Sequence, residues 1–298
     1  MEVSQFIADT GFGLVNAGIF ALAAVGFTLQ FSVTNVLNIA FGALMSLAAF
    51  LAYELNVVVG ANIWLALAVA GIGSGLISVL LNRGLIQPFL RRGTNFFGMV
   101  VVTIALDLIV EYAIEAIWGT NFFHYNVNTG SPVKFGGFLF THLQLVSIGI
   151  AVAGMIVIQL LLRRTKLGKA MRASSCDARL AKVCGIRTSR VYDAGWFISG
   201  VLAGVSGVIL GLSLGTFSFT LGDEYLIVII AATMLGGIGQ AYGAMLGALV
   251  IGLVTQWSSL VISSSYSEVV AFLILILVLL FRPQGIVSGV AVDRQMTA

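Results

Sequence analysis

The chain has 298 residues, of which 59% are hydrophobic and only 9% are charged, and its formal net charge is +3. An ordinary soluble domain carries roughly a quarter charged residues, so the 15 basic and 12 acidic side chains cannot coat a polar surface of this size. These values exclude the soluble classes, and lipid is the expected solvent for most of the chain.

Apolar runs long enough to cross a bilayer recur along the sequence, and a transmembrane helix needs about 20 such residues. They predict an all-α, polytopic membrane helical bundle of about eight transmembrane helices with broken or re-entrant segments, forming a single transmembrane domain over residues 1–298. The expected spans are 12–32, 36–57, 61–82, 95–118, 142–162, 192–214, a broken stretch over 225–257, and 267–281. The broken stretch either crosses twice, turning near residues 236–243, or enters and returns as a re-entrant pair.

Basic residues gather in three segments, at residues 83–92, 163–190 and 282–294. Because positive charge marks cytoplasmic loops, these segments are expected inside, with the N-terminus outside, the C-terminus cytoplasmic and residues 119–141 facing outward. The first ten residues carry no Lys or Arg, so no cleaved secretory signal is expected. This pattern explains the positive charge without a nucleic-acid partner and predicts a multi-pass protein of the inner (plasma) membrane in contact with lipid.

Cysteine and histidine spacing predicts neither a disulfide framework nor a metal site. Cys176 and Cys184 have no partner cysteine or nearby histidine, and His124 and His142 are too isolated for zinc geometry. The HExxH motif is missing from the sequence, and we expect a transport subunit rather than an enzyme.

Glycines recur on the faces of the predicted spans, where small residues let helices approach closely in lipid. They are Gly71, Gly73, Gly75, Gly200, Gly204, Gly207, Gly211, Gly243, Gly247 and Gly252. Tight packing is the simpler interpretation, and a pathway or hinge role is the alternative. The letters AFGALMS at 40–46 also resemble AYGAMLG at 241–247, as expected of a transporter with internal repeats.

The fourth predicted span contains Asp107, Glu111 and Glu115, spaced four residues apart along one helical face. An ionised carboxylate at mid-bilayer costs on the order of 2.5–3.5 kcal/mol, so these groups should avoid lipid. Asp107 lies nearest the middle of the span. Its role is either structural, through a hydrogen bond to a neighbouring span, or functional, as a contact for the ammonium group of a substrate or as a proton relay with Glu111.

Polar residues also surround the two expected helix breaks, where unwound backbone survives only if it is buried in protein or lines a cavity. They are Thr28, Gln30, Asn35, Asn38, Thr233 and Gln240. We expect Asn35, Asn38, Thr233 and Gln240 to line a substrate pathway, although a lone polar group in a span more often bonds another helix.

The segment 162–191 is too long for a simple connector and has a helical pattern of its own, bracketed by Gly168 and Gly185. Its alanine-rich face suits a helix that lies in a groove of a partner protein. A membrane-surface helix whose basic residues meet anionic headgroups is the alternative. Residue type and spacing leave both open.

Three separated motifs, TKLGKAMRASSCDARLAKVCGI, MLGGIGQAYGAMLGALVIG and FRPQGI, resemble the permease subunits of ABC importers for branched-chain amino acids, a family whose members also carry other amino acids and urea. The run at 35–42 is similar to the first paired-span segment of that family. Where the family commonly has His before the glycine and an acid after it, this chain has Phe41 and Ala43 on either side of Gly42. This departure concerns the identity of the substrate. Phe41 is therefore added to the candidate pathway residues.

The resemblance implies that loop 163–190 docks on an ATPase subunit as a coupling helix. The residues it assigns to this coupling are Gly168, Ala170, Arg172, Ala173, Asp177, Ala178, Ala181 and Gly185. It also implies two ATP-binding subunits, a second permease subunit that is similar or identical, and an extracytoplasmic substrate-binding protein.

The sequence has no GxxxxGK[ST] phosphate loop, so no cofactor is expected on this chain, and ATP and Mg are expected on the partner subunits. The competing hypotheses are a proton-coupled secondary transporter that uses the intramembrane carboxylates, and a membrane-embedded interaction subunit without a pathway.

Overall fold

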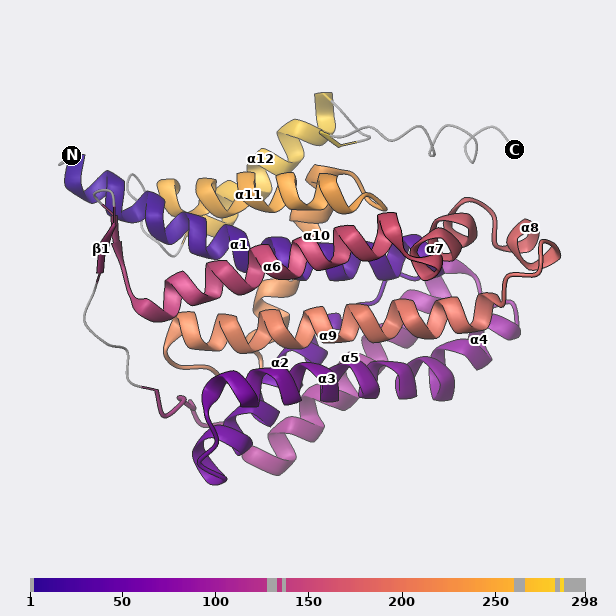
Figure 1. Cartoon of the computed structure of the whole chain (residues 1–298), viewed down its shortest axis with the longest axis horizontal. Coiled ribbons are helices and arrows are strands. Elements are labelled where there is room, and N and C mark those ends of the chain that lie inside the picture. Colours follow the sequence, from indigo (N-terminus) through magenta and orange to yellow (C-terminus); the bar gives the residue numbers. More distant parts are fainter. Residues whose placement is uncertain (1–2, 128–132, 136–137, 260–265, 282–284, 287–298) are drawn as a thin grey trace. The chain divides into compact units, whose positions relative to one another are not determined.

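The structure is a computed structural model, and it describes residues 3–127, 133–135, 138–259, 266–281 and 285–286. The described part is almost entirely helical, with one short hairpin (Figure 1). The elements are α1 (Val3–Thr34), α2 (Phe41–Tyr53), π-helix η1 (Glu54–Val58), α3 (Ile63–Leu81), π-helix η2 (Asn82–Ile86), α4 (Gln87–Arg91), α5 (Phe96–Trp118), β1 (Val133–Phe135), β2 (Phe138–Phe140), α6 (His142–Arg164), α7 (Lys166–Cys176), α8 (Ala178–Val183), α9 (Thr188–Leu214), α10 (Leu221–Gly236), α11 (Ala241–Ser258) and α12 (Ser267–Phe281).

Seven helical stretches in the described residues are long and apolar enough to cross a bilayer. They include the first six expected spans and α11, the second half of the expected broken stretch. The helices α10 and α12 have 16 and 15 residues. At 1.5 Å per residue they are about 24 and 22 Å long, less than a hydrocarbon core of roughly 30 Å. The predicted polytopic helical bundle with a broken segment is confirmed.

Contacts divide the chain into two compact units, and the prediction of a single domain stays a prediction. The first unit contains Met1–Thr28, Val127–Met155 and Ile227–Ala298, and the second contains Leu29–Asn126 and Ile156–Leu226.

The centre of the second unit is the packing of α2, α3 and α9, whose facing surfaces carry the glycines noted in the sequence. A methyl group added at Gly204 would lie 2.9 Å from the Cα of Gly71 on α3. One added at Gly200 would lie 2.9 Å from the Cα of Gly75. The tight-packing interpretation of these glycines is therefore confirmed, because van der Waals contact between close backbones holds helices together where lipid gives no hydrophobic force.

In the first unit, α10 and α11 form an antiparallel pair around the predicted break. The backbones approach so closely that a side chain at Gly236 would overlap Gly243, and one at Gly247 would overlap Ala232. Ile286 donates its backbone N–H to the carbonyl of Leu235 over 2.8 Å. Parts of the MLGGIGQ and FRPQGI motifs therefore lie against each other.

Two short segments add detail that the sequence did not predict. In the first unit, β1 and β2 pair antiparallel, with Val133 opposite Phe140. In the second unit, Phe123 and Phe217 exchange backbone hydrogen bonds of 2.8 and 2.9 Å. Tyr125 packs its ring on Phe217 at 4.8 Å and donates its hydroxyl to the carbonyl of Ala49, and burial raises the pKa of this hydroxyl.

Candidate functional site

The connection between α1 and α2 lies in the second unit and has no regular helix over residues 35–40. Asn35 is exposed and has a φ of 53°, a left-handed conformation that Asn adopts more readily than most residues. Thr103 on α5 donates its hydroxyl to the carbonyl of Leu37 over 3.0 Å. A side chain of a neighbouring span thus satisfies an unwound carbonyl that would be costly to bury alone.

Asp107 lies at the middle of α5 and is buried, with 8% of its surface exposed. The backbone N–H of Ala43, in the first turn of α2, donates to its Oδ1 over 3.4 Å. The residue before α2, Ala40, makes no side-chain cap. Asp107 therefore supplies, from another helix, the acceptor and the negative charge that the N-terminus of α2 lacks, as the structural alternative expected.

Two further carboxylates lie beside Asp107. Glu111 is one turn along α5, and Asp223 is in the first turn of α10, in the part of that helix that belongs to the second unit. One oxygen from each of the three groups lies within 4.8 Å of the others. The cluster is half-buried at Glu111 and Asp223. Asp223 was missed by sequence reasoning, because it precedes the apolar run of α10 and lies far along the chain from the other two acids.

The helix starts of α2 and α10 meet beside these carboxylates. Gly222 donates its backbone N–H to the hydroxyl of Ser46 over 2.8 Å. A side chain at Gly222 would overlap the carbonyl of Gly42, and one at Gly42 would come within 2.6 Å of Asp223 Oδ1. Glycine at both positions lets the positive ends of two helices, of 13 and 16 residues, point at the same group of acids.

A second buried polar group involves Asn38. Ser199 on α9 donates its hydroxyl to Gln30 Oε1 over 2.8 Å, and Asn38 Nδ2 reaches the same oxygen at 3.4 Å. Both amides are 1% exposed, and Gln30 Nε2 and Asn38 Oδ1 have no partner among the described residues. Phe41, which opens α2, is fully buried. Spare donors and acceptors of this kind suit buried water or a polar ligand.

The other two predicted pathway residues lie in the first unit. Thr233 is buried in α10 and donates its hydroxyl to the carbonyl of Ile230 over 2.7 Å, within its own helix. Gln240 is half-buried and immediately precedes α11. In both repeated sequences, AFGALMS and AYGAMLG, the alanine and aromatic residue lie where a helix resumes after a break.

The segment expected to be a helix between Gly168 and Gly185 forms two helices, α7 and α8. Thr165 caps α7 by accepting from the N–H of Gly168 over 3.0 Å. Asp177 has an extended backbone, ends α7, and accepts from the N–H groups of Arg179 and Leu180 at 2.8 and 2.9 Å. The expectation of a single coupling helix is therefore corrected, because the carboxylate of Asp177 caps a second helix.

Several of the predicted coupling residues face the protein itself. Gly168 and Ala181 are buried, and a side chain at Gly168 would overlap carbonyls at the end of α6. Met171 packs with Leu29 and Val33 of α1, which holds α7 on the second unit. These positions maintain the shape of the segment.

The remaining predicted coupling residues are more open. Arg172, Asp177 and Gly185 are exposed, whereas Ala170, Ala173 and Ala178 are half-buried. The most exposed apolar side chains of α8 are Leu180 at 61% and Val183 at 84%. An exposed apolar pair on a short basic helix outside the spans suits a partner protein.

Seven helical stretches in the described residues are long enough to span a bilayer, and polar side chains lie beside the interrupted backbone between α1 and α2. These features place this chain in the class of polytopic membrane transport proteins. Residues 10–279 match the family described as "Branched-chain amino acid transport system / permease component", so the chain belongs to this family. It is the membrane-embedded permease component of a transport system, a transport subunit rather than an enzyme.

Curated relatives match over nearly the full length. The high-affinity branched-chain amino acid transport system permease protein BraD of Pseudomonas aeruginosa is 27% identical and is covered over 99% of its length by 98% of this chain. LivH of Escherichia coli K12, of the same description, is 26% identical over 95% of each protein. The ribose import permease protein RbsC of the same strain is 25% identical, and the match covers 89% of this chain and 82% of the length of RbsC.

A solved structure described as "PsaBC from Streptococcus pneumoniae in complex with Fab" contains a chain with a similar fold. The TM-score is 0.51 at 12% identity, covering 92% of this chain and 91% of that one. At this identity the likeness concerns the fold alone.

Proposed function

We propose that this chain is the permease subunit of an ABC importer that translocates branched-chain amino acids, or closely related amino acids or small amides, across the inner membrane. The family match over residues 10–279 carries this proposal, supported by full-length relatives named for branched-chain amino acids. A relative named for ribose import has nearly the same identity, so uptake of labelled leucine is the test of the proposed substrate class.

The proposed assembly contains two ATP-binding subunits, a second permease subunit and an extracytoplasmic binding protein. ATP and Mg are bound by the ATP-binding subunits, and no cofactor is bound by this chain. The N-terminus faces outward and the C-terminus faces the cytoplasm, as the basic segments predict. Of the third basic segment, Arg282 and Arg294 lie outside the described residues.

The carboxylates Asp107, Glu111 and Asp223 are the proposed contact for the ammonium group of the substrate. Their oxygens lie within 4.8 Å of one another at the start of two short helices, next to backbone that has no regular helix. Broken helices with polar ends at membrane depth are typical of substrate sites in transporters. The buried amides Gln30 and Asn38 are the proposed polar lining on the cytoplasmic side, and Thr233 and Gln240 are further candidates in the first unit.

Coupling to ATP hydrolysis is assigned to α7 and α8. The exposed side chains Leu180 and Val183 are the proposed contacts with an ATP-binding subunit, while Gly168, Met171 and Ala181 connect the helix pair to the spans. Movement of this pair would then be passed to α1 and α9, which Met171 contacts.

The assembly is tested by affinity purification of the tagged chain from native membranes in mild detergent, followed by mass spectrometry of the bound proteins. We expect an ATP-binding subunit and a second polytopic permease to copurify. A chain that purifies alone and catalyses uptake in liposomes without any ATPase would reject the importer assembly.

The carboxylate cluster also suits a proton-coupled secondary transporter, which is the second candidate function. The two functions differ in their energy source. Uptake that requires a proton gradient and persists without ATP supports the second candidate, whereas uptake that requires ATP and survives an uncoupler supports the importer.

A further inference from the structure

A cavity of about 700 Å³ opens at the junction of α1, α4, α8 and α9 in the second unit. Its volume lies within the range typical of small-ligand pockets. The residues that line it come from three separate stretches of the chain: Thr34, Gln87, Leu90, Arg91, Lys182, Gly185, Ile186, Arg187, Thr188, Ser189 and Tyr192. The sequence patterns did not predict this cavity, although Lys182, Gly185 and Ile186 belong to the motif TKLGKAMRASSCDARLAKVCGI.

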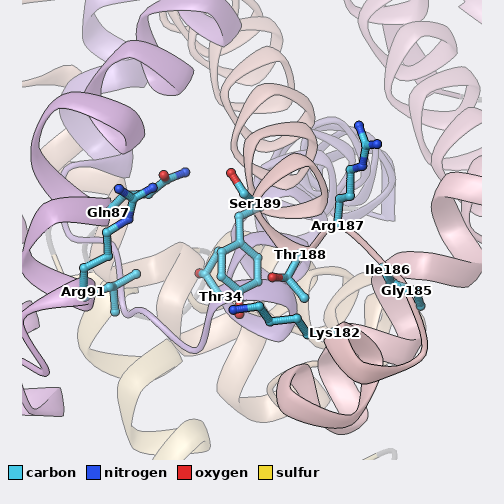
Figure 2. Close-up of a pocket in the computed structure, with 11 residues that line it drawn as sticks. Thr34, Gln87, Arg91, Lys182, Gly185, Ile186, Arg187, Thr188 and Ser189 are labelled. Atoms are coloured by element: carbon cyan, nitrogen blue, oxygen red, sulfur yellow. The ribbon is translucent and has the colours of Figure 1, made fainter.

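The cavity is strongly positive. Arg91, Lys182 and Arg187 line it, and its lining includes no carboxylate. The ion pair found among the described residues joins Arg83 to Asp193, and Arg91, Lys182 and Arg187 form none with those residues. In Figure 2, Lys182 extends toward Thr34, and Gln87 and Arg91 project from α4 toward Ser189, whereas Arg187 points away.

The carboxylate of Asp193 on α9, one residue beyond Tyr192 in the cavity wall, already accepts from four donor atoms. Its Oδ2 accepts from Arg83 at 2.8 and 3.0 Å, and its Oδ1 accepts from Asn82 at 2.9 Å and from Gln87 at 3.0 Å. These bonds hold α4 against α9 and use the amide nitrogen of Gln87. The charge of Asp193 is therefore compensated outside the cavity, and Arg91 and Lys182 remain to attract an anion.

Polar donors complete the wall opposite α4. Thr188 and Ser189 form the first turn of α9, a helix of 27 residues that has no side-chain cap at its N-terminus. The hydroxyls of Thr188 and Ser189 and the positive end of α9 therefore face the same space as the two cations. The lining also includes the apolar side chains of Leu90 and Ile186 and the ring of Tyr192.

We infer that this cavity binds a phosphate-bearing anion through Arg91, Lys182 and the first turn of α9. Several donors around a cationic centre match the multiple acceptor oxygens of a phosphate. The phosphate belongs either to the headgroup of an anionic phospholipid, which basic pockets between membrane helices commonly bind, or to a small soluble phosphate compound. This inference does not depend on the substrate that the protein transports.

The test uses the purified chain with the subunits that copurify, delipidated in mild detergent. Dioctanoyl phosphatidylglycerol, dioctanoyl phosphatidylcholine and inorganic phosphate are titrated separately, and thermal unfolding is followed by tryptophan fluorescence. We expect saturable stabilisation by phosphatidylglycerol or by phosphate, and none by phosphatidylcholine. Stabilisation by the lipid alone identifies a headgroup site, and stabilisation by phosphate as well identifies a soluble source.

The double variant Arg91→Gln, Lys182→Gln removes both cations from the cavity and should weaken the binding about 30-fold, as expected for two basic contacts to an anionic headgroup. The matched control is Arg179→Gln, Arg190→Gln, which removes the same charge from α8 and α9 outside the cavity and should bind as the wild type does.

Three results would overturn the inference. One is the absence of any shift with phosphatidylglycerol and phosphate, and another is an equal loss in the double variant and its control. The third is an unchanged anion response in the double variant combined with loss of a copurifying subunit, which would assign the cavity to an acidic segment of a partner protein.

Discussion

Asp107 is predicted to act twice, as the acceptor that caps α2 and as part of the proposed ammonium contact, and two substitutions separate these roles. Asp107→Asn keeps an oxygen that accepts the N–H of Ala43 but removes the charge. Asp107→Leu removes both and leaves that N–H without its acceptor in a buried position. Glu115→Gln, on the same helix and outside the cluster, is the control for loss of an acidic group.

The expected changes in the free energy of unfolding follow from the positions of these groups. Leaving a buried N–H unsatisfied costs about 1–3 kcal/mol, so Asp107→Leu should lower the free energy of unfolding by that amount. The carboxylate oxygens of the cluster lie within 4.8 Å of one another. At that upper limit, two ionised carboxylates repel by about 3.5 kcal/mol at an effective dielectric constant of 20, and the partial exposure of Glu111 and Asp223 reduces this value. Asp107→Asn relieves this repulsion, so its stability should equal or exceed that of the wild type.

The assay combines thermal unfolding in detergent with uptake of labelled leucine by the assembled transporter. At about 2–4 °C per kcal/mol, Asp107→Leu should melt several degrees below the wild type. Asp107→Asn should melt normally and yet lose most uptake, whereas Glu115→Gln should retain both properties.

Two outcomes would refute this account of Asp107. If Asp107→Leu melts as the wild type does, the carboxylate does not cap α2. If Asp107→Asn transports leucine at the wild-type rate, the carboxylate does not contact the ammonium group.

Three other predictions follow from close contacts and exposed surfaces. Gly222→Ala places a methyl group against a carbonyl of α2 and should destabilise the protein by about 1–3 kcal/mol in thermal unfolding, whereas Gly149→Ala, where an added methyl group meets no atom within 4 Å, should be neutral or slightly stabilising. Leu180→Asp and Val183→Asp should abolish copurification of an ATP-binding subunit while membrane insertion and the melting temperature stay unchanged. Asp193→Ala removes the acceptor shared by four donor atoms on η2 and α4 and should lower the free energy of unfolding by about 1–3 kcal/mol, measured by the same melt.

Each of these has a result that counts against it. Equal melting temperatures for Gly222→Ala and Gly149→Ala would contradict the close approach of α2 and α10. Normal subunit recovery after both α8 substitutions would show that the partner binds elsewhere. A wild-type melt for Asp193→Ala would show that water replaces the carboxylate without cost.

The spans could be predicted because hydrocarbon imposes a length and an apolar composition that the sequence displays directly. Tight packing at the glycine-bearing faces of α3 and α9 could also be predicted, since Gly71, Gly75, Gly200 and Gly204 repeat at helical spacing and small residues gather where membrane helices meet. The sequence did not predict that these two helices pair with each other. The break at 237–240 was visible because glycine interrupts an otherwise apolar run.

Features that depend on distant segments could not be predicted in this way. Asp223 joins Asp107 only because two glycines let the starts of α2 and α10 meet. The end of α7 at Asp177 depends on a competition between two local structures. The carboxylate of Asp177 can cap the start of α8, or the backbone can continue α7, and the cap is the more favourable of the two. Burial of Ala181 depends on the surfaces against which α8 folds, and the alanine pattern alone did not distinguish an inward face from a partner-facing one.

The proposed work of this chain as the permease of an ATP-driven importer is tested by uptake of labelled leucine into liposomes that contain the purified complex and its binding protein. We expect uptake that requires ATP, persists with an uncoupler and is lost in the double variant Leu180→Asp, Val183→Asp. Uptake that proceeds without ATP and collapses with the proton gradient would contradict it.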